Sequence, residues 1–172
     1  MAHDFLDAAL ARLAAAGLFP GGRPSGCTPD EIAEIEARCG IALPLSYRRF
    51  LAAMGRSAGR FLVGTDFTYP LLLDLRLQAD RLLVECSAKI ALNAADFVFT
   101  LHQGYQFLFF RCGLSDDPPV FYYEEGAPGF VQVAGSFSAW LTGCVDDEVA
   151  AAEDLHRSCG ERPLRLGRPV RR

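Results

Sequence analysis

The stretch from Asp96 to Leu141 constrains the fold of this chain more than any other, because it holds most of the aromatic residues. Two apolar runs, residues 97–102 and 105–112, meet at Gln103-Gly104. That spacing is typical of a two-residue β-hairpin whose glycine takes a positive φ. A second pair of apolar runs within residues 120–133 flanks a turn-rich connection. The sequence therefore predicts two consecutive hairpins in one antiparallel sheet.

The pairing expected for the first hairpin makes both faces of the sheet apolar. With a two-residue loop, the facing pairs are Val98 with Phe109, Thr100 with Phe107, and His102 with Tyr105. The other side then carries Phe97, Phe99, Leu101, Leu108 and Phe110. A half-buried sheet normally alternates apolar with polar residues, so either helices cover both faces or one face is kept for a partner. We predict that helices cover most of both faces, and the second alternative stays open.

Helical patterns precede this sheet. Residues 2–16 carry apolar residues at helical spacing, and Gly17 is placed to end that helix. After a linker rich in proline and glycine, Thr28-Pro29-Asp30-Glu31 has the pattern of a capping box for a helix that runs to Cys39. Another helix is expected from Leu43-Pro44 to Gly55, with its apolar face turned inward.

The remaining elements complete an α+β order. Residues 61–63 are expected to form a short strand, residues 69–73 a strand or the start of a helix, and residues 74–88 a helix. Ser136 caps a last helix that we expect to be interrupted at Gly143 and to resume from Asp146 to His156. Helices, then an antiparallel block, then a helix predict a single α+β domain with a mostly antiparallel central sheet flanked by helices.

Length and composition suit one globular domain, since the chain has 172 residues and about half of them are hydrophobic. We divide it into an N-terminal helix and linker (1–27), the main domain (28–156) and a mobile arginine-rich tail (157–172). The N-terminus lacks the basic and apolar regions of a secretory signal, and no apolar run reaches the length of a membrane span. A cytoplasmic location is the default expectation.

The sequence contains no pattern that indicates catalysis or a metal site. There is no G-x-S-x-G elbow, P-loop, G-x-G-x-x-G after a strand, or H-E-x-x-H. His102 lies at a hairpin end and is expected to be a turn residue rather than a base. The six cysteines are scattered and are expected to be buried free thiols, and His156-x-x-Cys159 lacks a second half-site. We therefore predict no enzymatic activity, no cofactor and no metal.

Two stretches resemble a known family. Thr28-Pro29-Asp30-Glu31-Ile32, followed by Leu43-Pro44-Leu45-Ser46-Tyr47-Arg48-Arg49-Phe50-Leu51, is similar to the N-terminal signature of the SUKH superfamily. Ser136-Phe137-Ser138-Ala139-Trp140-Leu141 is similar to its usual ending. The superfamily includes fungal cell-wall-assembly regulators of the Smi/Knr type and many bacterial immunity proteins. The resemblance implies an α+β domain without catalysis that binds other proteins, commonly a toxin encoded beside it.

Acidic residues are concentrated between Arg111 and Arg157, where the chain has no lysine or arginine. This block is either a solvated surface kept soluble by like charge or a negative surface that attracts a basic partner. The tyrosines at positions 105, 122 and 123 are candidate anchors, with burial in the core as the alternative. The residues predicted to contact a partner are Asp116, Asp117, Tyr122, Glu124, Glu125, Asp146, Asp147 and Glu148.

Together these observations predict an immunity protein that binds and neutralises a basic toxin domain encoded nearby, for which a nuclease is one candidate. The alternative is a regulatory or scaffolding module that binds a housekeeping protein. Neither nucleic acid nor a membrane is an expected partner. The arginine-rich tail has no interleaved aromatic residues, and the net charge of the chain is -4.

Overall fold

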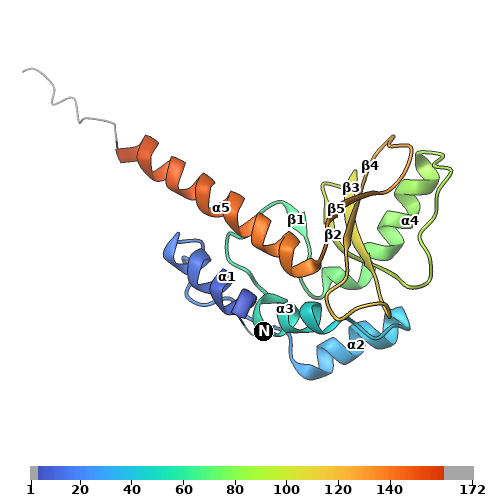
Figure 1. Cartoon of the computed structure of the whole chain (residues 1–172), viewed down its shortest axis with the longest axis horizontal. Helices are drawn as coiled ribbons and strands as arrows, with labels where there is room; N and C mark the ends of the chain where they lie inside the picture. The colour runs from blue at the N-terminus through green and yellow to red at the C-terminus, as the bar shows by residue number, and fades with distance from the viewer. Residues whose placement is uncertain (1–3, 161–172) are drawn as a thin grey trace, which may run out of the picture.

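The computed structural model describes residues 4–160 and has one five-stranded antiparallel sheet with helices on both sides (Figure 1). The helices are α1 (Asp4–Ala15), α2 (Pro29–Cys39), α3 (Leu45–Met54), α4 (Leu75–Glu85) and α5 (Phe137–Gly160), with a 3-10 helix η1 (Leu71–Asp74). The strands are β1 (Thr65–Asp66), β2 (Asp96–His102), β3 (Gln106–Arg111), β4 (Val120–Glu124) and β5 (Val131–Ala134). They lie in the sheet in chain order. The predicted α+β fold is therefore confirmed.

Helices cover both faces of the sheet, as predicted. On one face, the fully buried ring of Tyr47 in α3 lies 5.1 Å from the ring of Phe110 and 5.2 Å from that of Phe137, the first residue of α5. On the other face, buried leucines of α4 join a second aromatic cluster, in which the rings of Phe109 and Phe130 are 4.8 Å apart. Aromatic pairs at these separations add to the energy of area burial. Figure 1 shows the sheet with α4 on one side and α5 on the other.

The first hairpin turns at Gln103-Gly104 as predicted, but its loop has three residues, 103–105, rather than the predicted two, because His102 pairs with Gln106 and not with Tyr105. Gln103 and Gly104 have φ values of 48° and 83°, and the amide of Tyr105 donates to the carbonyl of His102 at 3.2 Å. Two positive φ values at the central positions match the twist of the flanking strands. The turn chemistry of Gln103-Gly104 was therefore sufficient to place the hairpin.

The predicted register of this hairpin is correct only at its open end. Val98 lies opposite Phe109, but Phe99 is left unpaired by a β-bulge. Beyond the bulge the pairs are Thr100 with Leu108, Leu101 with Phe107, and His102 with Gln106. An extra residue in one strand reverses which side chains face which side, so Thr100 and Leu101 exchange the faces that were predicted for them. The sequence carried no signal for this shift, because both faces are apolar.

Two further predictions about elements are wrong. The last helix is continuous through Gly143, because Leu141 and Val145 on either side of it are fully buried and hold the helix in place. Residues 61–63 form a turn rather than a strand, since Leu62 has a φ of 54° and the short strand comes later, at β1. In the apolar run at 69–73, residues 69–70 form a turn and residues 71–73 belong to η1, which leads into α4.

Local capping signals were predicted correctly. The amide of Glu31 donates to Thr28 Oγ1 at 3.3 Å, and the amide of Thr28 donates to Glu31 Oε2 at 2.8 Å. Gly40 ends α2 with a φ of 65°. At α5, the amide of Ala139 donates to Ser136 Oγ at 3.1 Å. These interactions span few residues, which is why sequence alone could place them.

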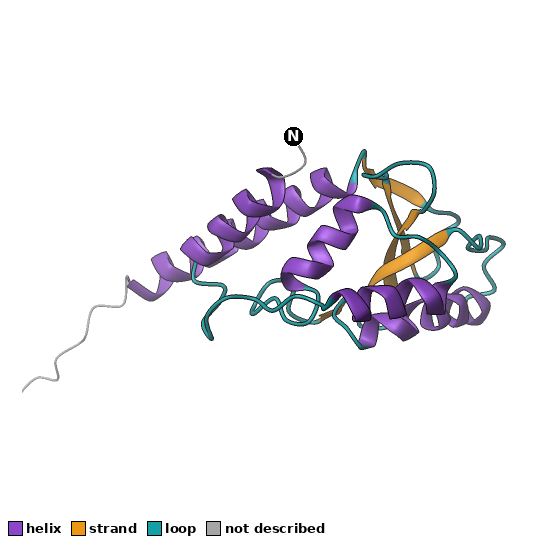
Figure 2. Ribbon diagram, turned by 90° about the horizontal axis from the view of Figure 1, so that it is seen from below, coloured by secondary structure: helices purple, strands orange, loops and turns teal. Residues whose placement is uncertain are grey.

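The N-terminal helix α1 packs along α5, as both views show (Figures 1 and 2). Leu6, Ala9 and Leu13 of α1 are buried, and Arg12 forms an ion pair with Asp146 of α5 at 2.6 Å. The sequence predicted that the tail begins at residue 157, but residues 157–160 belong to the end of α5. Residues 161–172 lie outside the described residues.

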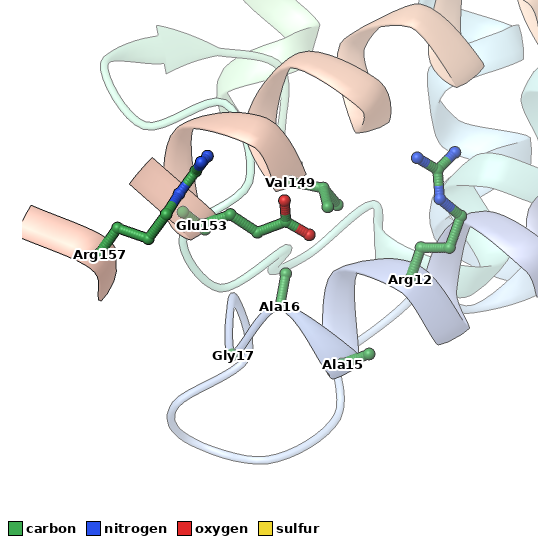
Figure 3. Close-up of a pocket in the computed structure, with 8 residues that line it drawn as sticks. Arg12, Ala15, Ala16, Gly17, Val149, Glu153 and Arg157 are labelled. Atoms are coloured by element: carbon green, nitrogen blue, oxygen red, sulfur yellow. The ribbon is translucent and has the colours of Figure 1, made fainter. Parts of the chain in front are cut away.

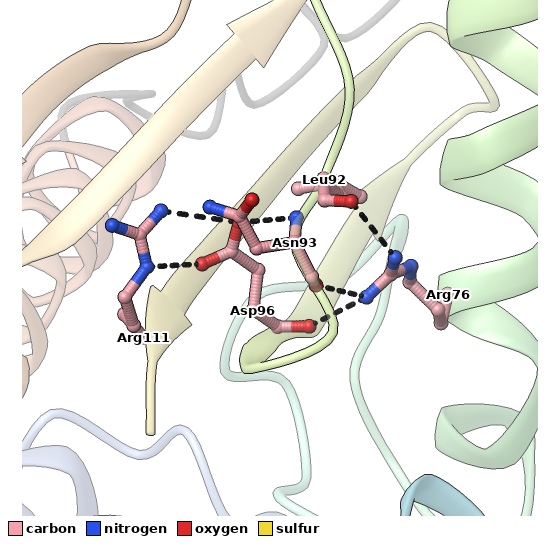
Figure 4. Close-up of polar contacts among 5 residues, drawn as sticks. All are labelled: Arg76, Leu92, Asn93, Asp96 and Arg111. Carbon is pink, nitrogen blue, oxygen red and sulfur yellow. Dashed lines mark hydrogen bonds and ion pairs between the residues drawn. The ribbon is translucent and has the colours of Figure 1, made fainter. Parts of the chain in front are cut away.

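A buried carboxylate fixes the loop that leads into β2 (Figure 4). Asp96 accepts hydrogen bonds from Arg111 Nε and from the amide of Asn93, both at 2.8 Å. Arg76 of α4 donates to the carbonyls of Asn93 and Asp96 at 2.9 Å and to that of Leu92 at 3.2 Å. The hydrogen bond to Asp96 raises the pKa of Arg111. The ion pair between Asp96 and Arg111 joins β2 to β3. Arg76 joins α4 to the start of β2 and to the loop before it.

Candidate functional site

A groove of about 240 Å³ lies between α5 and the hairpin end of the sheet. The sheet contributes Leu108 and Tyr122 to its lining, and α5 contributes Trp140 and Cys144. Leu62, in the turn before β1, lines it as well. The lining is mostly apolar. The groove is therefore an apolar part of the α5 side of the sheet that the helices leave uncovered.

The β-bulge in β2 creates the floor of this groove. Residues paired directly across strands share one face of the sheet. Thr100 is opposite Leu108, Leu108 is opposite Tyr122, and Tyr122 is opposite Val131. These four residues form a row, which we call the groove row, that crosses β2, β3, β4 and β5 on the α5 side. Without the bulge, Thr100 would face α4 and the row would be broken.

Polar groups stand at one end of the groove. His102 Nδ1 lies 2.9 Å from Thr65 Oγ1, which ties β1 to β2. Gln106 Nε2 donates to Glu124 Oε1 at 3.3 Å. Burial, and then the carboxylate of Glu124, raises the pKa of Tyr122 above its ordinary value.

The eight predicted contact residues fall into three places. Tyr122 lines the groove and Glu124, at the end of β4, accepts a hydrogen bond from Gln106 of that lining, whereas Glu125 lies at the hairpin tip outside the lining. On α5, Asp147 and Glu148 follow Cys144 by three and four residues and so lie on the same side of the helix. Burial and then these two carboxylates raise the pKa of Cys144 to about 12. The structure therefore brings Glu124 and this part of α5 to the same groove.

Intramolecular contacts already engage several of the predicted acids. On α5, Asp146 pairs with Arg12, and Glu148 accepts a hydrogen bond from the amide of Leu62 at 3.2 Å. Asp147 and Glu125 are exposed. An acid that is already paired has less to gain from a basic partner. Asp147 and Glu125 are therefore the acids best placed to meet one.

The predicted residues Asp116 and Asp117 lie at the other end of β4, away from the groove. The carbonyl of Asp116 accepts from the amide of Ser46 in α3 at 2.9 Å. The carboxylate of Asp117 accepts from the amide of Ser138 in α5, also at 2.9 Å. Their contacts hold the loop before β4 against two helices, a role that sequence did not suggest.

Sequence reasoning missed Leu62, Thr65 and Cys144 as groove residues. Of the three candidate tyrosines, Tyr123 is buried in the core, whereas Tyr105 and Tyr122 are partly exposed. Successive side chains of a strand point to opposite faces of the sheet, so a strand at this position already implied that Tyr122 and Tyr123 lie on different faces. No local signal placed Leu62 or Thr65 there, because they reach the groove only through the pairing of β1 with β2.

A larger hollow of about 670 Å³ lies between α1 and α5 (Figure 3). Alanines from both helices form its surface, and Arg12, Glu153 and Arg157 stand around it. Its lining has neither histidine nor cysteine. We assign the site to the groove instead, because the aromatic side chains of Tyr122 and Trp140 line the groove and no aromatic side chain lines the hollow.

Within residues 4–160, no group of three His, Cys, Asp or Glu side chains is placed to hold a metal ion. The imidazole of His102 contacts a threonine hydroxyl rather than a carboxylate. None of the helices between residues 4 and 160 has the length and apolar character needed to cross a bilayer.

A five-stranded meander between α4 and α3, with an apolar groove at its hairpin end, defines a small α+β domain. The model of the SMI1 / KNR4 family (SUKH-1) matches residues 26–143, more than half of the chain, and the chain belongs to this family. The match leaves α1 and the outer part of α5 outside it. None of the curated proteins matches the chain.

Proposed function

We propose that this chain is an immunity protein that binds a toxin encoded beside it and neutralises it without catalysis. Membership of the SUKH-1 family supports a protein-binding role. The observation that carries the proposal is the groove, whose apolar floor lies between two exposed acids: Glu124, which bonds to Gln106 of the lining, and Asp147, one helical turn after Cys144 of the lining. Such a surface suits a partner that is basic at its rim and apolar at its centre.

The two parts of the surface have different tasks. Exposed acids attract a basic partner over several ångströms and so raise the association rate. Tyr122 and Trp140 offer large apolar side chains that lose little conformational entropy on binding, and they supply the lasting affinity. A nuclease is a suitable partner, because the surface that it turns to phosphate is basic.

Co-expression with the toxin domain encoded next to this gene tests the proposal. The expected result is that growth is restored and that the two proteins co-purify. If the neighbouring toxin neither binds nor is neutralised, the proposal fails.

The second candidate is a regulatory or scaffolding module that binds a housekeeping protein. It is supported by the family match itself, since the superfamily also contains cell-wall regulators. The genes around this one separate the two candidates. A toxin gene next to it favours immunity, and its absence favours regulation.

Reversing the charge of Asp147 is the sharpest test of the surface. Because Asp147 is exposed beside the groove, Asp147→Lys should slow association with the toxin by about tenfold at low salt and flatten its dependence on ionic strength. Stopped-flow or surface-plasmon measurements at several salt concentrations would show this.

The matched control is Glu153→Lys, the same change on an exposed residue further along the same helix and away from the groove. It should alter the association rate much less. Equal association rates for wild type and Asp147→Lys would remove this part of α5 from the proposed surface.

A further inference from the structure

The edge strand β5 is unusually open. It is the last strand of the sheet and pairs only with β4. Within the part of the chain that the structure describes, residues 131–134 form no backbone hydrogen bond outside that pairing. The side chains of Val131 and Val133 are 57% and 48% exposed. One row of backbone donors and acceptors therefore faces solvent between two exposed valines.

Soluble proteins usually protect such an edge. Lysine, proline, inward-pointing charge or a covering element blocks the addition of another strand. The strand Val131-Gln132-Val133-Ala134 has neither charge nor proline. One bulge interrupts its ladder with β4 and leaves Val133 without a partner between Gln132 and Ala134. An edge that lacks charge and proline and carries β-branched residues is suited to pair with an extended segment.

This edge is continuous with the groove. Val131 is the last member of the groove row and lies opposite Tyr122. A strand added beside β5 would extend the row by one more side chain, next to Val131. The residues two positions before and after that side chain in the added strand would face the same side of the sheet. Backbone pairing and groove occupation are thus compatible in one partner segment.

The charge around the edge indicates what kind of segment fits. Glu124 and Glu125 stand at the hairpin tip from which β5 begins, and no arginine or lysine occurs between Arg111 and Arg157. A second copy of this chain would bring no compensating charge from that region, and each copy has a net charge of -4. An arginine- or lysine-bearing segment would be complementary.

We propose that β5 is a strand-addition site that takes an extended, basic segment of a protein partner. The backbone of that segment pairs with residues 131–134, its apolar side chains extend the groove row, and its basic side chains meet Glu124 and Glu125. This rests on the proposed function, because it states how the toxin is held.

The test uses the full chain and a displayed library of random peptides about ten residues long, a length that covers a strand. The expected result is enrichment of positively charged peptides with alternating apolar residues. A synthetic copy of the most enriched peptide should bind the double variant Val131→Lys/Val133→Lys at least about tenfold more weakly than wild type, because lysine guards the edge.

Two controls isolate the contribution of the strand. Leu77→Lys/Val84→Lys adds the same charge at exposed apolar positions of α4, which packs on the other face of the sheet, and should leave peptide binding unchanged. A copy of the peptide with alternate amides N-methylated keeps its side chains but loses donors, and should bind about tenfold more weakly. Glu125→Gln should weaken binding of the basic peptide by about threefold.

Several outcomes would overturn the proposal. These are no enrichment, enrichment of acidic peptides, equal binding to the β5 variant, or equal binding of the N-methylated peptide. A dimer in sedimentation that the β5 variant abolishes would assign the edge to a second copy. Peptide binding only by a chain ended at Gly160 would assign it to the chain's own last residues.

The two proposals can fail separately. If the β5 variant still neutralises the neighbouring toxin, strand addition is wrong and immunity stands. If basic peptides bind through β5 but no neighbouring toxin is bound, the immunity proposal is wrong and the edge site stands.

Discussion

Tyr47 shows how much a single residue can organise in this fold. Its ring contacts Phe50 of its own helix, Phe97, Phe99 and Phe110 of the sheet, and Phe137 of α5. Its hydroxyl is buried without a hydrogen-bond partner in the described structure, and burial raises its pKa well above the ordinary value. The ring therefore stabilises the fold, whereas the hydroxyl carries a desolvation cost.

Tyr47→Phe should therefore raise the free energy of unfolding by about 1 kcal/mol, because it removes an unpaired buried hydroxyl and keeps the ring. Urea denaturation measures the change. Tyr47→Leu is the control, and it should destabilise by a few kcal/mol because it removes the aromatic packing. A loss of stability in Tyr47→Phe would show that the hydroxyl has a partner.

Cys144 couples stability to alkaline pH. Burial and two nearby carboxylates raise its pKa to about 12 in the folded protein, so the native state holds the thiol proton more tightly than the unfolded state does. The stabilisation is complete below the ordinary thiol pKa and is lost as the pH rises from there toward the folded value.

Between about pH 7.5 and about pH 10.5, wild type should lose on the order of 1–2 kcal/mol more unfolding free energy than Cys144→Ala. Urea denaturation under reducing conditions at each pH measures this. Comparison with the alanine variant cancels the contribution of Cys112, whose pKa burial also raises to about 12. Parallel pH curves for the two proteins would contradict it.

At the scale of elements, two glycines have opposite roles. Gly143 lies on the exposed side of α5, and a Cβ there would meet no atom within 4 Å. Gly26 lies so close to α3 that a Cβ would fall 1.7 Å from the carbonyl oxygen of Ala52. The first glycine only weakens its helix, whereas the second permits the approach of the linker to α3.

Gly143→Ala should raise the unfolding free energy by about 0.5–1 kcal/mol, because alanine has the higher helix propensity. Gly26→Ala is the matched control and should lower it by about 2 kcal/mol or more, since backbone atoms must move. Thermal and urea denaturation of both variants would measure this. Destabilisation by Gly143→Ala would show that α5 needs flexibility at this point.

At the scale of the whole molecule, α1 is packed on the domain although the family match begins only at residue 26. Its buried residues Leu6, Ala9 and Leu13 cover α5 on the side where Val145 and Ala152 are buried. The outer part of α5 has little else to pack against, so α1 and α5 stabilise one another.

Deleting residues 1–17 should lower the unfolding free energy by about 4 kcal/mol, the value expected for exposing two leucines and their partners. Urea denaturation measures it. Arg12→Ala is the control, because it removes only an exposed ion pair with Asp146 and should change stability by less than about 1 kcal/mol. An unchanged midpoint after the deletion would show that α1 contributes nothing.

The sequence by itself determined the features that depend on neighbouring residues. These are the capping box at Thr28 and Glu31, the turn at Gln103-Gly104 and the N-cap at Ser136. Each depends on hydrogen bonds or backbone angles within a few residues, and such preferences are encoded locally.

Only the tertiary structure decided where the groove lies. The bulge at Phe99 put Thr100 in one row with Leu108, Tyr122 and Val131. The tertiary structure also showed that the carboxylate of Asp117 accepts a hydrogen bond from the amide of Ser138 in α5 rather than facing solvent. When both faces of a strand are apolar, alternation cannot reveal a shift of one residue. Contacts between distant segments then decide which side chains are buried and which are left for a partner.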